Sequence, residues 1–120
     1  MRKQITLAEA GDVMTTALEG GIGYWSFALG IERDDELNCT SYVLMPGCAD
    51  HAAEFPPTSV TRQMVRAAWK EVAEGKHRIC NDYLDQMRDA TREPGDAGCV
   101  DAGVADYIVQ VAVMGEARFG

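Results

Sequence analysis

The strongest constraint on the fold is a hairpin pattern in the first half of the chain. From Trp25 onward every second residue is large and apolar, as in a strand with one buried face: Trp25, Phe27, Leu29 and Ile31. This pattern predicts a strand over 24–31, and the apolar run over 39–45, after a polar turn, predicts its antiparallel partner. A two-stranded hairpin alone is only marginally stable in water, so we expect helices to cover its aromatic face. We expect any third strand to come from a partner chain or from the C-terminal tail.

Four other segments carry apolar residues at helical spacing and are separated by glycine, proline and other turn residues. The predicted helices span residues 7–19, 59–74, 78–91 and 101–114. The last segment also has the composition of a strand, but Asp101 before it and Gly115 after it are typical of the ends of a helix. The predicted fold class is therefore α+β, a hairpin packed against about four helices in a single domain, residues 1–120.

Capping residues indicate where the predicted helices begin and end. Thr6 and Glu9 have the spacing of a capping box at the start of the first helix. We expect Gly20 to end that helix in the left-handed conformation. Thr58 or Ser59 is the expected N-cap of the second helix.

The composition is that of a soluble globular protein, because 47% of the residues are hydrophobic and 25% are charged. No run approaches the roughly 18 apolar residues of a membrane-spanning helix, so we expect no membrane partner. The chain opens on an amphipathic segment without the features of a secretory signal, which predicts a cytoplasmic location.

The formal net charge is −8, and it is unevenly distributed. Residues 59–92 carry seven basic and five acidic side chains, a balance of +2, which leaves −10 on the rest of the chain. An acidic protein is a poor non-specific nucleic-acid binder, because phosphate neutralisation supplies most of that affinity. Within this stretch Arg62, Arg66 and Lys70 recur every four residues and form a basic row on the predicted helix.

The basic row has two interpretations. As a binding site, it holds the phosphate of a small anionic ligand while an aromatic side chain, Tyr24, Trp25 or Trp69, stacks on a ring of that ligand. As a structural feature, it is a solvated face that keeps the helix soluble, or one that meets the acidic surface of another subunit.

A second group of candidate site residues lies near the two ends of the chain. Glu19 precedes the glycine-rich turn, and Asp106 and Gln110 lie four residues apart on one face of the last predicted helix. Two carboxylates and an amide have the chemistry for acid–base catalysis or for holding a cation. The alternative is a buried polar network. The turn itself follows a helix and precedes a strand, the reverse of a phosphate loop, which favours a helix stop with close packing.

Both histidines stand three residues from a cysteine, as Cys48 with His51 and His77 with Cys80. Two thiolates and two imidazoles complete a tetrahedral zinc shell, so zinc is the one cofactor that the sequence suggests. The alternative is a coincidence of spacing, with a surface histidine and small buried thiols. The protein then has no cofactor, and its four cysteines are free thiols in a reducing cytosol.

Dense segments at both ends of the chain carry a family resemblance. They are LEGGIGYW at 18–25, DAGVADYIVQ at 101–110 and GEARFG at 115–120. These segments resemble the opening and closing signatures of a family of small proteins encoded by tailed bacteriophages. The resemblance implies an accessory protein in the cytoplasm of the infected host cell, and it implies no substrate. The polar positions that match the signatures are Glu19, Tyr24, Asp106 and Gln110.

Two functional interpretations follow. In the first, the protein is a non-catalytic binding or interaction module that acts on a host protein or sequesters a small anionic ligand. The alternative is a small hydrolase or metal-dependent enzyme that uses Glu19, Asp106 and the histidine and cysteine residues. The sequence contains no recognised nucleophile, phosphate or metal motif, which favours the first. We also expect a homo-oligomer, because a domain of this size leaves apolar surface uncovered.

Overall fold

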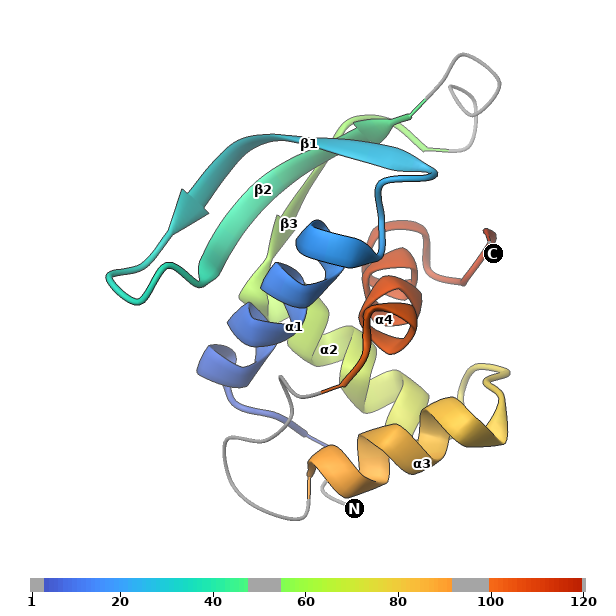
Figure 1. Cartoon of the computed structure of the whole chain (residues 1–120). Helices are drawn as coiled ribbons and strands as arrows, with labels where there is room; N and C mark the ends of the chain where they lie inside the picture. Colours follow the sequence, from blue (N-terminus) through green and yellow to red (C-terminus); the bar gives the residue numbers. More distant parts are fainter. Residues whose placement is uncertain (1–3, 48–54, 92–99, 120) are drawn as a thin grey trace.

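The computed structural model describes residues 4–47, 55–91 and 100–119, which form one antiparallel sheet and four helices (Figure 1). In chain order the elements are α1 (Leu7–Gly20), β1 (Ser26–Arg33), β2 (Cys39–Pro46), β3 (Thr58–Thr61), α2 (Arg62–Ala73), α3 (Asn81–Ala90) and α4 (Ala102–Met114). The predicted α+β class is confirmed. None of the described helices is long and apolar enough to cross a membrane.

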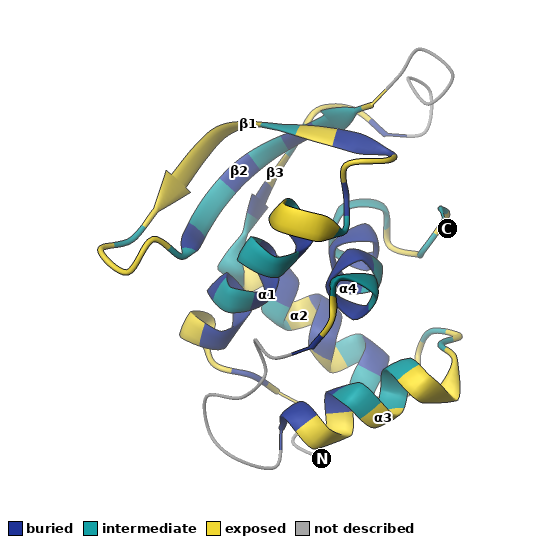
Figure 2. Cartoon of the chain, in the orientation of Figure 1, coloured by how far each residue is buried: buried dark blue, intermediate teal, exposed yellow. Residues whose placement is uncertain are grey.

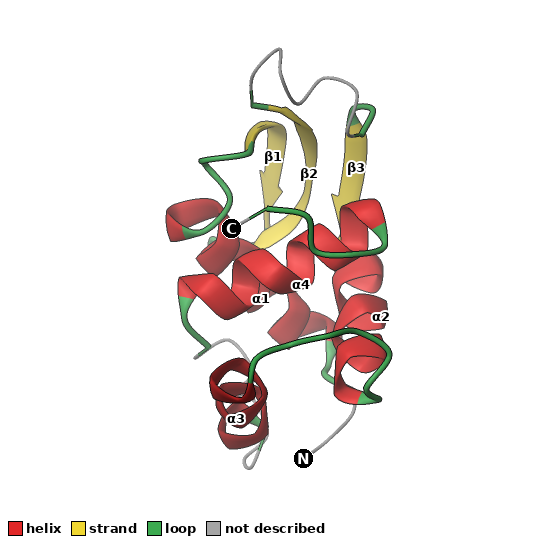
Figure 3. Cartoon of the chain, turned by 90° about the vertical axis from the view of Figure 1, so that its right-hand side faces the viewer, coloured by secondary structure: helices red, strands yellow, loops and turns green. Residues whose placement is uncertain are grey.

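The sheet and α3 lie on opposite sides of a layer formed by α1, α2 and α4, as both Figure 1 and Figure 3 show. The strand order is β1-β2-β3, so β2 is central and β1 and β3 are the edges. One face of the sheet covers the helical layer, and no described helix covers the other face.

Helix α1 begins as the sequence predicts, but it ends differently. The capping box is confirmed, because Glu9 N donates to Thr6 Oγ1 at 3.1 Å and Thr6 N donates to Glu9 Oε1 at 3.0 Å. The prediction of a left-handed Gly20 is wrong: Gly20 is the last residue of α1, and Gly21 follows it with φ −115°. Gly21 is needed for close packing, because a Cβ there would lie 2.6 Å from the carbonyl oxygen of Ala102.

The last segment is a helix, as its caps predict. Asp101 Oδ1 accepts a hydrogen bond from Val104 N at 2.9 Å, and Gly115 ends α4 in the left-handed conformation with φ 78°. The helix predicted over 78–91 is shorter and covers only α3. Residues 92–99, between the third and fourth predicted helices, lie outside the described residues.

The third strand comes from a segment that the sequence placed at the start of a helix. Thr58–Thr61 form β3, which pairs antiparallel with β2, so the described third strand comes from neither the C-terminal tail nor a partner chain. Helix α2 begins only at Arg62, behind the N-cap Thr61, whose Oγ1 accepts from Met64 N at 3.3 Å. Pairing with β2 satisfies the backbone of a stretch whose β-branched residues favour a strand.

The exposed face of β1 is the one that the sequence predicted to be buried. Three residues of the expected core face are exposed, by 47%, 49% and 41% respectively: Phe27, Leu29 and Ile31. Trp25 is fully buried, but it precedes the strand, in a turn where Trp25 N and Ser26 N donate to the carbonyl oxygen of Ile22. The inner face of β1 begins instead with Ser26, and Ala28 pairs with the buried Leu44. Trp25 therefore does not share a strand face with Phe27 and Leu29.

The core lies between the inner face of the sheet and the three helices beneath it, and Met87 and Ala90 extend it to α3 (Figure 2). Its largest fully buried side chains include Trp25, Trp69, Tyr42, Ile5, Met14, Ile22, Leu44, Met87 and Ile108. Trp69 of α2 therefore belongs to the core and is not available for stacking on a ligand. Trp25 stacks on Phe119 with ring centroids 5.5 Å apart, and it meets the edge of Phe55 at 5.6 Å.

The contrast between Trp25 and Phe27 gives a direct test of the observed faces. We expect Trp25→Ala to lower the free energy of unfolding by about 3–5 kcal/mol, because it leaves a large cavity in the core. Phe27→Ala removes an exposed ring and should cost less than about 1 kcal/mol. Urea denaturation of both variants measures the difference, and similar losses in the two would contradict the assigned faces.

Candidate functional site

The two ends of the chain meet at the carboxylate of Asp106 in α4. The Tyr24 hydroxyl donates to Asp106 Oδ2 at 2.7 Å, and Trp25 Nε1 donates to Asp106 Oδ1 at 2.7 Å. Gln110, one turn further along α4, donates from Nε2 to the same Oδ1 at 3.1 Å. The carboxylate is therefore held by two aromatic donors from the turn after α1 and by an amide from its own helix.

Gln110 joins the C-terminal tail to the same group. Its Oε1 accepts hydrogen bonds from Arg118 N and Phe119 N, both at 2.8 Å, and its Nε2 donates to the Phe119 carbonyl oxygen at 3.2 Å. Since the Phe119 ring stacks on Trp25, the tail closes over the tryptophan. We call this set the Asp106 cluster: Tyr24, Trp25, Asp106, Gln110 and Phe119.

The hydrogen bonds of the Asp106 cluster favour a structural role for the carboxylate. Both oxygens of Asp106 accept from side chains of the cluster, and the residue is only 9% exposed. Although Tyr24 is 55% exposed, partial desolvation of its hydroxyl and the hydrogen bond to Asp106 raise the pKa of Tyr24 above its ordinary value. A carboxylate in this setting is a buried acceptor and not a free general base.

Glu19 lies outside this network. It is exposed near the end of α1, beside an open pocket of about 310 Å³ lined by Leu18, Glu19, Gly20, Gly21, Gly23 and Tyr24. The Glu19 side chain forms no hydrogen bond or ion pair with the described residues. Of the four polar signature positions, the structure therefore joins three and leaves Glu19 apart.

The side chain of Arg62, the first residue of the basic row, bonds to other parts of the protein. Arg62 Nε donates to the Cys39 carbonyl oxygen at 2.8 Å, and Arg62 Nη2 pairs with Asp34 Oδ2 at 2.9 Å. The guanidinium holds the pKa of Asp34 below its ordinary value through this hydrogen bond. Gly11 of α1 makes room for the side chain, because a Cβ there would lie 2.5 Å from Arg62 Nε. Arg62 thus connects α2 to the hairpin.

Arg66 and Lys70 do not form a ligand site together with Tyr24 and Trp25. Arg66 Nε donates to the Ile5 carbonyl oxygen at 2.7 Å, and the exposed side chain of Lys70 bonds to none of the described residues. The contacts of Arg62 and Arg66 are with the hairpin and the chain just before α1, whereas Tyr24 follows the end of α1. The structure therefore separates the basic row from Tyr24 and Trp25.

The proposed zinc ligands are only partly described. Cys48 and His51 lie outside the described residues. His77 Nε2 lies 3.2 Å from Glu71 Oε1, and Cys80 is an exposed thiol at the N-cap of α3. No group of three or more potential metal ligands occurs within the described ranges. Zinc binding stays a prediction.

The sequence analysis did not predict that the outer face of the sheet exposes apolar side chains. Cross-strand pairing joins Phe27 to Met45 and Leu29 to Val43, and paired residues lie on the same face. We call these four residues the open sheet face. A signal was present, because the run Tyr42-Val43-Leu44-Met45 in β2 is apolar on both faces.

The segments that resemble phage signatures contribute all members of the Asp106 cluster. Tyr24 and Trp25 belong to the first segment, Asp106 and Gln110 to the second, and Phe119 to the last. No protein-family model matches the chain, and no curated protein or solved structure matches it. Membership of the phage family therefore stays a proposal.

Asp106→Asn tests the structural role of the cluster. The amide removes the charge and turns one acceptor into a donor that faces another donor. We expect a loss of about 1.5–3 kcal/mol in the free energy of unfolding. Asp35→Asn, in the exposed hairpin turn, makes the same chemical change and should stay within about 0.5 kcal/mol of wild type. Urea denaturation at pH 7 compares them; equal, small effects would show that Asp106 is not a structural acceptor.

Arg62→Ala and Lys70→Ala separate the two interpretations of the basic row. Arg62→Ala should destabilise the protein by about 1–3 kcal/mol, because it leaves Asp34 and the Cys39 carbonyl without their partner. Lys70→Ala should have an effect within about 0.5 kcal/mol. Thermal and urea unfolding measure both. If Arg62→Ala is as stable as wild type, the guanidinium is free to serve a ligand.

Proposed function

We propose that this protein is a non-catalytic interaction module of a tailed bacteriophage, which binds a host protein in the cytoplasm through the open sheet face. The proposal is carried by a single observation, the group of apolar side chains that this face presents. Phe27 and Leu29 are about half exposed, and their partners Met45 and Val43 are partly exposed beside them. Single exposed apolar residues are common, but a contiguous group marks an interaction surface.

Charge around the open sheet face indicates the chemistry of the partner. Beyond a register shift that follows Leu29, Glu32 pairs with Ser41, two residues from Val43 in β2, and its Oε2 accepts from the Ser41 hydroxyl at 3.3 Å, so its carboxylate lies at one end of the face. Arg33 is used locally, since its Nη1 donates to the Leu37 carbonyl oxygen at 2.8 Å. A matching partner presents an apolar ridge with a basic residue at one end.

The same charge argues against a second copy as the occupant. Glu32 lies at one end of this face, and Arg33, the basic residue of the described strands, donates instead to the Leu37 carbonyl oxygen. Two copies packed face to face would leave each Glu32 carboxylate without a cation, and each chain carries a net charge of −8. The expected homo-oligomer therefore stays a prediction, with an interface elsewhere on the molecule.

The two alternatives receive less support from the geometry. Anion binding at the basic row requires Arg62 and Arg66 to give up partners inside the protein. Hydrolysis by Glu19, Asp106 and His77 requires groups that share no hydrogen bond among the described residues, and Asp106 already accepts from the Asp106 cluster. An interaction surface needs no such rearrangement.

The test begins with a photocrosslinking amino acid in place of Phe27, and a control with the same amino acid in place of the exposed Gln63 of α2. In host cells, we expect position 27 to crosslink a specific host protein that position 63 does not. The purified partner should then bind the Phe27→Ser/Leu29→Ser variant at least about tenfold more weakly than wild type, because truncating central apolar residues removes most of the interface energy.

Leu7→Ser provides the matched control, since Leu7 is also an exposed leucine, 39% exposed, but lies at the start of α1. It should bind the partner as wild type does. Equal binding by wild type and the double variant would overturn the proposal. Crosslinking of position 27 to a second copy of the chain, with loss of a dimer in sedimentation of the double variant, would overturn the host partner and establish the homo-oligomer.

A further inference from the structure

A separate opening lies on the side of the molecule away from the sheet, where the connection between α2 and α3 crosses α4. Two pockets adjoin here. One, of about 470 Å³, is lined by Arg78, Ile79, Cys80, Tyr83 and Tyr107. The other, of about 390 Å³, is lined by Lys76, His77, Arg78, Tyr107, Glu116 and Ala117. Because Arg78 and Tyr107 line both, the two pockets adjoin along these two residues, and we call the pair the linker pocket.

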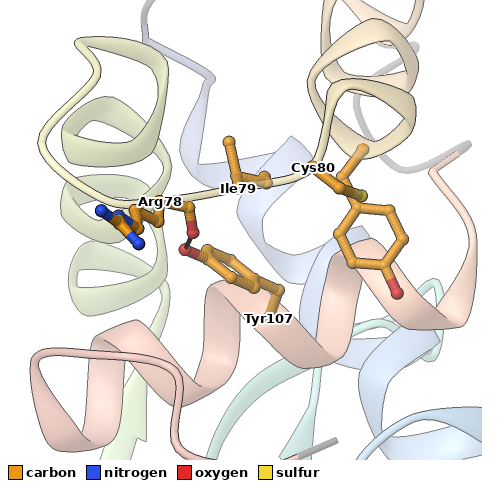
Figure 4. A pocket seen from close by; sticks show the side chains of 5 residues that line it. Arg78, Ile79, Cys80 and Tyr107 are labelled. Carbon is orange, nitrogen blue, oxygen red and sulfur yellow. Dashed lines mark hydrogen bonds between the residues drawn. The ribbon is translucent and has the colours of Figure 1, made fainter.

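The wall that the two pockets share is held in place. The Tyr107 hydroxyl donates to the backbone carbonyl of Arg78, as the dashed line in Figure 4 marks. Figure 4 shows Tyr107 reaching from α4 toward the linker, between Arg78 on one side and Cys80 on the other. The ring of Tyr83 meets Tyr107 edge-on, with centroids 6.4 Å apart and planes at 76°. Gly103 lets Tyr83 approach α4, since a Cβ there would lie 2.5 Å from the Tyr83 hydroxyl.

The cations of the linker pocket are available, unlike Arg62 and Arg66 of the basic row. The Arg78 guanidinium and the Lys76 ammonium are exposed and form no hydrogen bond or ion pair with the described residues. The one carboxylate in the lining, Glu116, pairs with Arg118 at 3.1 Å, and His77 lies against Glu71. In a chain with a net charge of −8, this opening therefore carries two free cations against one carboxylate that is already paired.

We propose that the linker pocket binds a nucleoside monophosphate, with the phosphate beside Lys76 and Arg78 and the base against Tyr107 and Tyr83. A guanidinium and an ammonium provide charge-assisted hydrogen bonds to phosphate oxygens, and phosphate is the anion that arginine geometry matches. Tyrosine rings beside the cations provide the surface on which a planar base stacks, whichever base it is. Free phosphate would use only the first half of the site.

This site is independent of the open sheet face. Its residues come from the linker, α3, α4 and the chain after α4, and none of them belongs to the sheet. The inference goes beyond the proposed function, because a protein partner on the sheet and a nucleotide in the linker pocket involve different surfaces. If one of the two proposals fails, the other is unaffected.

Isothermal titration calorimetry with AMP, GMP, CMP and UMP tests the proposal, with inorganic phosphate and adenosine as partial ligands. We expect at least one mononucleotide to bind saturably, and more tightly than phosphate or adenosine. Arg78→Glu should weaken that binding at least about tenfold, because it replaces a charge-assisted hydrogen bond by repulsion. The matched control is Arg88→Glu in α3, which makes the same change in charge at an exposed arginine outside the pocket.

Cys80 gives a second readout that needs no substitution, because its exposed thiol lines the pocket. A bound mononucleotide should slow alkylation of Cys80 by iodoacetamide, followed by peptide mass spectrometry. The proposal is overturned if none of the four mononucleotides binds saturably, or if Arg78→Glu and Arg88→Glu weaken binding equally. It is also overturned if phosphate binds as tightly as the mononucleotides, or if saturating nucleotide leaves the alkylation rate of Cys80 unchanged.

Discussion

The buried carboxylate of Asp106 is the interaction on which the rest of the structure depends. Removing a carboxylate from water costs several kcal/mol unless hydrogen bonds replace its hydration. Here the replacement comes from Tyr24 and Trp25, more than 80 residues earlier in the chain, and from Gln110 on the same helix. The hydrogen-bond donors to the Asp106 carboxylate therefore bring together the turn after α1 and helix α4. Phe119 adds the C-terminal tail to the same cluster.

Burial of Trp25 in this cluster determines which face of the sheet meets the core. The turn at Ile22 ends with Trp25 beneath the tail, and β1 then begins with Ser26 facing inward. The larger residues of β1 are thereby directed outward, where they pair with Val43 and Met45. The apolar surface that we assign to a protein partner thus follows from the constraint that places the tryptophan in the core.

Some basic side chains bond within the protein, whereas others have no described partner and can contact an anion. Arg62 and Arg66 of α2 use their donors on backbone carbonyls and on Asp34, which fastens the helix to the hairpin and to the chain before α1. Lys76 and Arg78, a short distance further along, lie on an exposed linker with their charges directed to no described partner. A regular four-residue spacing indicated function, but Arg62 and Arg66 are engaged within the protein, whereas the irregularly spaced Lys76 and Arg78 are available for an anion.

The sequence alone determined the features that depend on groups a few residues apart. The Thr6 and Glu9 capping box and the Asp101 and Gly115 ends of α4 involve partners within four residues, so composition and spacing were sufficient. It also indicated Asp106 and Gln110 as candidate polar residues without showing their partners. Tertiary structure decided what depends on distant partners: the strand character of residues 58–61, the inward face of β1 and the role of Arg62, whose acceptors lie 23 and 28 residues away. Local sequence patterns do not encode these pairings, because the paired residues meet only when the whole chain folds around a common core.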